Sequence, residues 1–331
     1  MSVPTKISYG VLVAMLVVAA WLHLGPLVLA AFFSYFALRK IYAATNRKWI
    51  SVILFIIGLV GITYAAGYFT RAAWRALPEI AESSIPSATA WAEQRNIELP
   101  FTDFETLKAF VIDQLKDEIH YLSNVAHFAG AATTLIVLVI IGIVVAASLF
   151  FRSWFVFEKY PTPGGDGNAN NLYTACAREI ATRFHGLYRS FEIVMGAQII
   201  ISSINTVLTA IFVLIIGLPH AAVVIGVTFL CGLLPIIGNL ISNTIIVFLS
   251  ATISLKLALV ALAFLIGIHK LEYFLNSKIV GGWTRNPVWL TLIGLIIGQA
   301  VMGIPGMVLA PVVLNYLRVE LSKIQLPAAA A

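Results

Sequence analysis

The sequence has few charged residues, few cysteines and none of the common catalytic signatures. Of its 331 residues, 11% are charged, whereas soluble globular proteins carry about 25%, because their surface must face water. This scarcity argues against a large soluble helical core, whose helices would need polar faces. The only cysteines, Cys176 and Cys231, are far apart and form no CxxC pair, so the sequence predicts neither a disulfide nor a metal site. It contains no HExxH or GxSxG motif, and we expect no enzyme and no cofactor.

The charge balance is basic, with a formal net charge of +6 and a pI near 9.3. In a soluble protein such a balance can indicate nucleic acid binding. Here the basic residues are few and lie beside apolar segments, so membrane topology explains them better. We therefore expect the lipid bilayer, and no nucleic acid, as the partner of these residues.

The sequence instead contains long apolar runs, and 60% of its residues are hydrophobic. A run of about 18 or more apolar residues predicts a helix that spans the bilayer. Such stretches include 11–21, 52–69, 129–151 and 193–218, and no small-residue cleavage site near residue 21 marks the first as a signal peptide. The predicted fold is an all-α integral membrane protein, a polytopic helical bundle with a small helical extracytoplasmic domain.

The distribution of charges predicts the topology. Short loops rich in lysine and arginine, at 39–48 and 152–189, are expected in the cytoplasm, and the long acidic stretch at 78–127 is expected outside. Both termini are then cytoplasmic. The expected organisation is three N-terminal transmembrane helices (1–75), an extracytoplasmic helical domain (76–127), a fourth transmembrane helix (128–151), a cytoplasmic loop (152–191), a transport core (192–323) and a C-terminal tail (324–331).

Two proline-containing breaks interrupt the apolar segments of this core. The last apolar region is broken at 303–306, leaving arms of about 15 residues or about 22 Å, shorter than a hydrocarbon core of about 30 Å. This region is predicted to form a re-entrant helical hairpin. The segment around Pro235 has the same design, and either two full crossings or one re-entrant hairpin fits it.

Polar side chains inside the membrane are costly and need a partner or a purpose. One helical stripe comprises Gln198, Ser202, Asn205 and Thr209, and it suits either a substrate path or hydrogen bonding between helices. The breaks add backbone groups that only protein or a water-filled cavity can satisfy, as in transporters with discontinuous helices, although ordinary kinks are the alternative. Their candidate residues are Pro235, Gly238, Asn239 and Asn243 for the first break and Gln299, Gly303, Pro305, Gly306 and Asn315 for the second. If the two tips approach each other near the midplane, the layout is that of an inverted repeat with a central binding site.

A third candidate group lies on the helix predicted at 257–274. His269, Glu272 and Asn276 share one face of this helix, and such a group could relay protons because histidine titrates near neutrality. The alternative is that Lys270 and Lys278 mark the cytoplasmic end of the helix.

Short motifs in the second half of the chain resemble the autoinducer-2 exporter-like family of bacterial and archaeal transporters, also called PerM-type permeases. The motifs are Tyr188-Arg189, Gly196-Ala-Gln198, Gly217-Leu-Pro219, Leu234-Pro-Ile-Ile-Gly238, Glu272-Tyr-Phe-Leu-Asn276 and Gly303-Ile-Pro-Gly-Met-Val-Leu-Ala-Pro311. This resemblance implies secondary transport in the bacterial cytoplasmic (inner) membrane, with export of a small signalling molecule in some members and cation/proton exchange in others.

The sequence therefore predicts a secondary transporter, ion- or proton-coupled, for a small polar solute or a monovalent cation, with a proton or sodium as coupling ion. A passive channel is the alternative, although it should show a ring of like residues at a constriction. A homo-oligomer is a candidate assembly. The substrate, its direction and the coupling ion do not follow from these residues.

Overall fold

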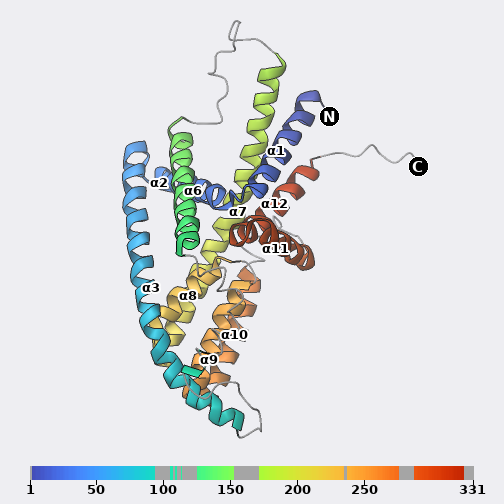
Figure 1. Ribbon diagram of the computed structural model, residues 1–331. Coiled ribbons are helices and arrows are strands. Elements are labelled where there is room, and N and C mark those ends of the chain that lie inside the picture. The colour runs from blue at the N-terminus through green and yellow to red at the C-terminus, as the bar shows by residue number, and fades with distance from the viewer. Residues whose placement is uncertain are drawn as a thin grey trace, which may run out of the picture. The chain divides into compact units, whose positions relative to one another are not determined.

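The computed structural model describes residues 2–93, 125–152, 171–234, 237–275 and 287–323, together with 105, 106, 109 and 113. These residues form helices joined by short turns, without a strand among them. The helices are α1 (Val3–Trp21), α2 (Gly25–Thr45), α3 (Lys48–Glu93), α6 (Val125–Arg152), α7 (Leu172–Ile215), α8 (Ala221–Gly232), α9 (Ile237–Ile253), α10 (Leu255–Leu275), α11 (Val288–Met302) and α12 (Ile304–Leu321) (Figure 1).

Six helical stretches in the described part of the chain are long and apolar enough to cross a membrane. They are Val3–Trp21, Gly25–Thr45, Lys48–Ala72, Ala132–Arg152, Leu172–Ile215 and Ile304–Leu321. Their apolar side chains remain largely exposed, as expected for helices whose solvent is lipid. The predicted class, a polytopic all-helical membrane protein, is confirmed.

The helix ends follow local sequence signals. The side chain of Ser2 caps α1 by accepting the backbone N–H of Thr5 at 3.4 Å. Pro26 lies in the first turn of α2, where its missing N–H costs nothing. Asn46 ends α2 in the left-handed conformation, and Gly303, at a φ of 64°, separates α11 from α12 at the predicted break.

Two helices extend well beyond their apolar runs. α3 continues to Glu93, although we expected the third segment to end near residue 69, and α7 begins at Leu172 rather than near 193. The early start of α7 has a physical reason, because its first half is amphipathic and buries Ala181, Leu187 and Phe191 against protein. A search for uninterrupted apolar runs does not detect a helix of this kind.

The chain divides into two compact units. The first comprises Met1–Ile57, Leu135–Ala197 and Val280–Ala331, and the second comprises Gly58–Thr134 and Gln198–Ile279. In the first unit, Phe191 of α7 is fully buried, and its ring lies 5.1 Å from that of Phe32 and 4.9 Å from that of Phe33 on α2. This aromatic group fixes the first half of α7 to α2.

Replacing Phe191 by alanine should destabilise the first unit substantially. The substitution leaves a cavity among three aromatic rings and should lower the free energy of unfolding by about 3 kcal/mol or more. Thermal unfolding in detergent measures the effect, with Phe248→Ala as the control, because Phe248 is half exposed. Equal melting temperatures for the two variants would contradict this assignment of the core.

The second unit has its own apolar core where α7, α8, α9 and α10 meet. The fully or nearly fully buried members are Val213, Leu218, Val224, Ile246, Leu249, Ala261 and Leu265. The rings of Phe212 and Phe264 stack beside them, with centroids 4.0 Å apart. This core holds the second half of α7 against the helices that carry the polar candidates.

The helices α11 and α12 of the first unit pack antiparallel on each other at very short range. A Cβ atom on Gly298 would strike the carbonyl oxygen of Gly306, and a Cβ on Gly306 would lie 2.7 Å from the carbonyl carbon of Gly298. Such an approach requires glycine on both helices. Whether this pair re-enters the membrane, as its short arms predict, stays a prediction.

Candidate functional site

The polar stripe of α7 lies against the end of α8 in the second unit. The side-chain amide of Gln198 donates to the carbonyl oxygen of Gly232 at 2.6 Å, and the Ser202 hydroxyl donates to that of Phe229 at 2.9 Å. Both carbonyls belong to the last turn of α8, where the helix offers them no internal partner. Gln198 and Ser202 therefore cap the helix that precedes the first break, which is the interhelical hydrogen bonding that the sequence allowed.

Three polar residues from three helices form a hydrogen-bonded chain in the same unit. The Nδ2 atom of Asn205 on α7 donates to Oδ1 of Asn239 on α9 at 3.3 Å, and Nδ2 of Asn239 donates to Oε2 of Glu272 on α10 at 2.5 Å. Asn205 and Asn239 are 7% and 8% exposed, and Glu272 is half-buried. The hydrogen-bonded chain thus leads from the buried amide of Asn205 to the carboxylate of Glu272.

One atom of this chain has unused hydrogen-bonding capacity. The Oδ1 atom of Asn205 is buried and has no hydrogen-bond partner among the described residues. An acceptor without a partner in a low-dielectric interior is costly, and such groups commonly face water, an ion or a ligand. Together with Glu272, this atom gives the site two oxygen acceptors of different charge.

The other candidate site residues of the second unit lie near this hydrogen-bonded chain or outside the described residues. Thr209 is fully buried one turn beyond Asn205, and Asn243 is half-buried one turn beyond Asn239. Gly238 is buried, and a Cβ there would strike the carbonyl oxygen of Cys231. His269 is exposed one turn before Glu272. Pro235 and Asn276 lie outside the described residues.

The candidates of the first unit are dispersed along α11 and α12. Gly303 forms the turn between the helices, Pro305 is half-buried and Gly306 is buried against α11. The side chain of Gln299 is exposed, and its carbonyl oxygen accepts the N–H of Gly303 at 2.9 Å. Asn315 lies further along α12, 1% exposed, and its Oδ1 finds no partner in the described part of the chain. The grouping of Asn205, Asn239 and Glu272 is therefore the one that the contacts support best.

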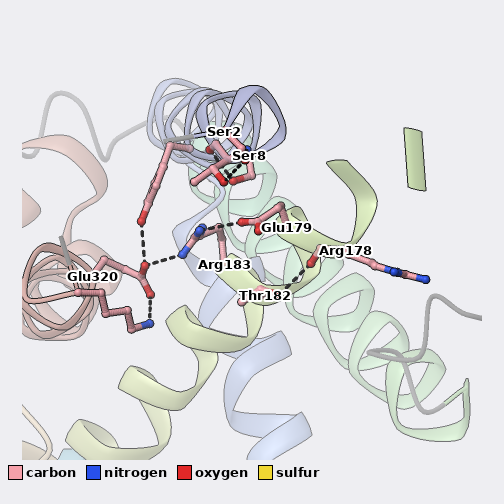
Figure 2. Close-up of polar contacts among 10 residues, drawn as sticks. Ser2, Ser8, Arg178, Glu179, Thr182, Arg183 and Glu320 are labelled. Carbon is pink, nitrogen blue, oxygen red and sulfur yellow. Dashed lines mark hydrogen bonds and ion pairs between the residues drawn. The ribbon is translucent and has the colours of Figure 1, made fainter. Parts of the chain in front are cut away.

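A charged network in the first unit was not foreseen from the sequence. Glu320 of α12 accepts from Arg183 of α7 at 2.7 Å, from the Tyr9 hydroxyl of α1 at 2.9 Å and from Lys323 at 2.6 Å (Figure 2). Arg183 also pairs with Glu179 at 2.8 Å. In the sequence, Arg183 and Lys323 served only as markers of topology. The available signal was Glu320 itself, an acidic residue at the end of the last apolar region.

Comparison with known proteins points to membrane transport. A family model described as AI-2E family transporter matches residues 9–323. A Bacillus subtilis (strain 168) protein named "Putative transport protein YdbI" is 29% identical over 177 residues, which cover 51% of this chain and 49% of that protein. The chain thus spans about half the length of this curated relative.

Proposed function

The chain belongs to the AI-2E transporter family, and on that premise we propose that this membrane transporter works by secondary transport, moving a small polar solute or a monovalent cation in exchange for protons or sodium ions. The main observation in support of this proposal is the hydrogen-bonded chain from Asn205 through Asn239 to Glu272. It combines one ionisable group with neutral amides, as a coupled site requires.

Glu272 is the group proposed to carry the coupling ion. A carboxylate that is half-buried between apolar helices is stabilised by a proton or a small cation, because either removes an uncompensated charge from a low-dielectric region. The amide of Asn239 donates to this carboxylate and holds it in place. Binding and release of the ion at Glu272 would therefore change the charge at the end of the amide chain.

The buried amides are proposed to receive the transported species. Asn205 Oδ1 can accept from a hydroxyl group or contribute to the coordination of a partly dehydrated cation. The other residues predicted for the path are Gln198, Ser202, Thr209, Pro235, Gly238 and Asn243, and we propose that they shape the same site. The second break, with Gln299, Gly303, Pro305, Gly306 and Asn315, is proposed to belong to the transport path as well.

The direct test is transport by the purified protein in sealed vesicles. The vesicles contain a pH-sensitive dye, an inward or outward pH gradient is imposed, and sodium, potassium or autoinducer-2 is added outside. We expect proton movement that depends on one of these solutes and saturates with its concentration. Proton movement no faster than in protein-free vesicles under every condition would refute the proposal for this panel.

A passive channel is the alternative function. It would conduct down a gradient without requiring a second species, and it would not accumulate solute against its own gradient. Accumulation driven by an imposed pH gradient therefore separates the two. The unequal groups of the Asn205–Glu272 chain favour a transporter, since they form no ring of like residues.

Replacing Asn205 by leucine should impair transport much more than folding. Leucine has the same number and branching of side-chain heavy atoms, although its methyl groups are larger, and the change removes both the donor to Asn239 and the unpaired acceptor. We expect about a tenfold loss of the transport rate, since polar contacts to a substrate contribute on the order of 1.4 kcal/mol each. Folded yield is the control measurement. Equal losses of transport and of folded protein would assign Asn205 to interhelical packing instead.

The orientation in the membrane is also a proposal. We propose a bacterial inner-membrane protein with cytoplasmic termini, cytoplasmic loops at 39–48 and 152–191, and the 76–127 region outside, following the positive-inside rule. A single cysteine introduced by Ser322→Cys, with both native cysteines replaced, should react with an impermeant thiol reagent only after the cells are opened. Reaction on intact cells would mean an odd number of crossings.

A further inference from the structure

The charged network of the first unit is built so that its interhelical contact can break without leaving an unpaired charge. Between the helices, Arg183 of α7 pairs with Glu320 of α12. Within α7, Arg183 also pairs with Glu179 one turn earlier, and at the end of α12, Glu320 also pairs with Lys323, which lies two residues beyond the helix. Each helix therefore carries its own complete ion pair.

Burial distinguishes the two kinds of contact. The side chains of Arg183 and Glu320 are 11% and 4% exposed, whereas those of Glu179 and Lys323 are 35% and 56% exposed. Burying two charges in place of apolar groups is often unfavourable, and extra hydrogen-bond partners offset part of that cost. A contact that opens gains a great deal, because a charge freed by separation keeps a counter-ion on its own helix.

The surroundings of the contact also fit separation of the helices. At Gly186, one turn after Arg183, a Cβ atom would lie 3.2 Å from the ring of Tyr316 and 3.3 Å from Oε1 of Glu320, so any other residue here would push these side chains of α12 by a few tenths of an ångström. The Tyr316 hydroxyl and Nε of Arg183 are buried and have no partner in the described residues. When the two helices separate, the Tyr316 hydroxyl and Nε of Arg183 can form hydrogen bonds with water or with nearby polar groups.

The third helix of the network adds a contact that depends on the same pair. The Tyr9 ring of α1 lies 4.4 Å from the guanidinium carbon of Arg183, and its hydroxyl donates to Glu320. Tyr9 thus touches both members of the interhelical pair.

We propose that the Arg183–Glu320 pair is an ionic latch that closes α7 on α12 in one state of the protein and opens in another, with Glu179 and Lys323 as the partners that hold the two charges while it is open. The inference rests on the proposed function only because a transporter must alternate between conformations. It assigns roles to four charges that the transport site does not use.

Two sets of substitutions test the latch. The milder variant, Glu179→Gln/Lys323→Gln, keeps the interhelical pair and removes the partner of each charge in the open state. The stronger variant, Arg183→Glu/Glu320→Arg, keeps an interhelical pair of reversed polarity but places like charges one turn apart on each helix. Its matched control reverses all four charges, Glu179→Lys/Arg183→Glu/Glu320→Arg/Lys323→Glu, and so restores attraction on both helices while changing Tyr9's neighbours in the same way.

The readout is the reaction of a native thiol with a small maleimide. Cys176 lies on α7 two turns before Arg183, on the same face, and is half-buried, and Cys231→Ala makes it the single cysteine. We expect labelling to slow about threefold in the milder variant and about tenfold in the stronger one, because the open state loses attraction or gains repulsion on both helices. The four-charge reversal should label at about the wild-type rate.

Several results would overturn the latch. Unchanged or faster labelling in the milder variant would show that Glu179 and Lys323 do not support an open state, and this variant should fold because both side chains are partly exposed. Equal labelling of the two-charge and four-charge reversals would likewise make the pair a static bridge. Labelling needs no substrate, so the expected order of rates in a protein that moves no protons would support the latch and count against the proposed function alone.

Discussion

Replacing Glu272 by glutamine should abolish ion-coupled transport while leaving the protein folded. Glutamine has the same shape, and its side-chain oxygen can still accept the amide of Asn239, so the hydrogen-bonded chain to Asn205 is kept. What is lost is the group that can gain and lose a proton or hold a cation. We expect the rate of coupled proton movement to fall by about 100-fold, the scale of loss when a positioned proton-transferring side chain is removed.

The measurement is dye-reported proton flux in vesicles that contain equal amounts of folded protein. Glu192→Gln is the matched control, because Glu192 is also a partly buried glutamate and pairs with the exposed Lys40 at 3.0 Å. It should retain most of the flux. If Glu272→Gln transports as well as the control, Glu272 carries no coupling ion, and the carboxylate serves only to anchor Asn239.

Gly306→Leu should destabilise the protein strongly. The new side chain would start from a Cβ atom 2.7 Å from the carbonyl carbon of Gly298 and 2.9 Å from Cβ of Met302. Because the first of these atoms belongs to the backbone, no change of rotamer relieves the clash, and α11 and α12 must separate. We expect the folded yield to collapse, with a loss of at least about 3 kcal/mol in the free energy of unfolding.

Gly10→Leu is the control for this substitution. Gly10 also lies in an apolar helix of the first unit, but nothing lies within 4 Å of a Cβ built there. Leucine is the better helix former, so this change should be neutral or slightly stabilising. Folded yield by size-exclusion chromatography and thermal unfolding in detergent compare the two. Similar stability of both variants would mean that the close approach of α11 and α12 is not needed.

The sequence predicted the elements of this fold more completely than their contacts. Apolar runs located the membrane helices, and glycine with proline located the turn at Gly303, because both signals act over a few adjacent residues. The first half of α7 was missed, since its burial depends on aromatic partners on α2 that no local pattern reveals. Polar residues were recognised as costly within apolar segments, which drew attention to Asn205, Asn239 and Glu272, and the structure joins these three by hydrogen bonds.

The pairing of polar residues could not be derived in the same way. Asn239 and Glu272 are 33 positions apart, and Arg183 and Glu320 are 137 apart, so only the packing of the helices decides that they meet. Arg183 was interpreted as a topology marker because arginines in loops usually have that meaning. The buried carboxylate of Glu320 pairs with Arg183 and changes this interpretation. Only the tertiary structure reveals this pairing.

The span of the Tyr9–Glu320 hydrogen bond, 311 positions along the chain, has a consequence for biosynthesis. The ribosome makes α1 and α7 before α12, so neither Tyr9 nor Arg183 can meet Glu320 until α12 has been synthesised. At about 5–20 residues per second, the 137 positions between Arg183 and Glu320 take roughly 7 to 27 s. During this interval Glu179, made just before it, can neutralise the arginine while α7 inserts into the bilayer. The joining of α1 to α12 therefore follows the synthesis of all the helices described between them.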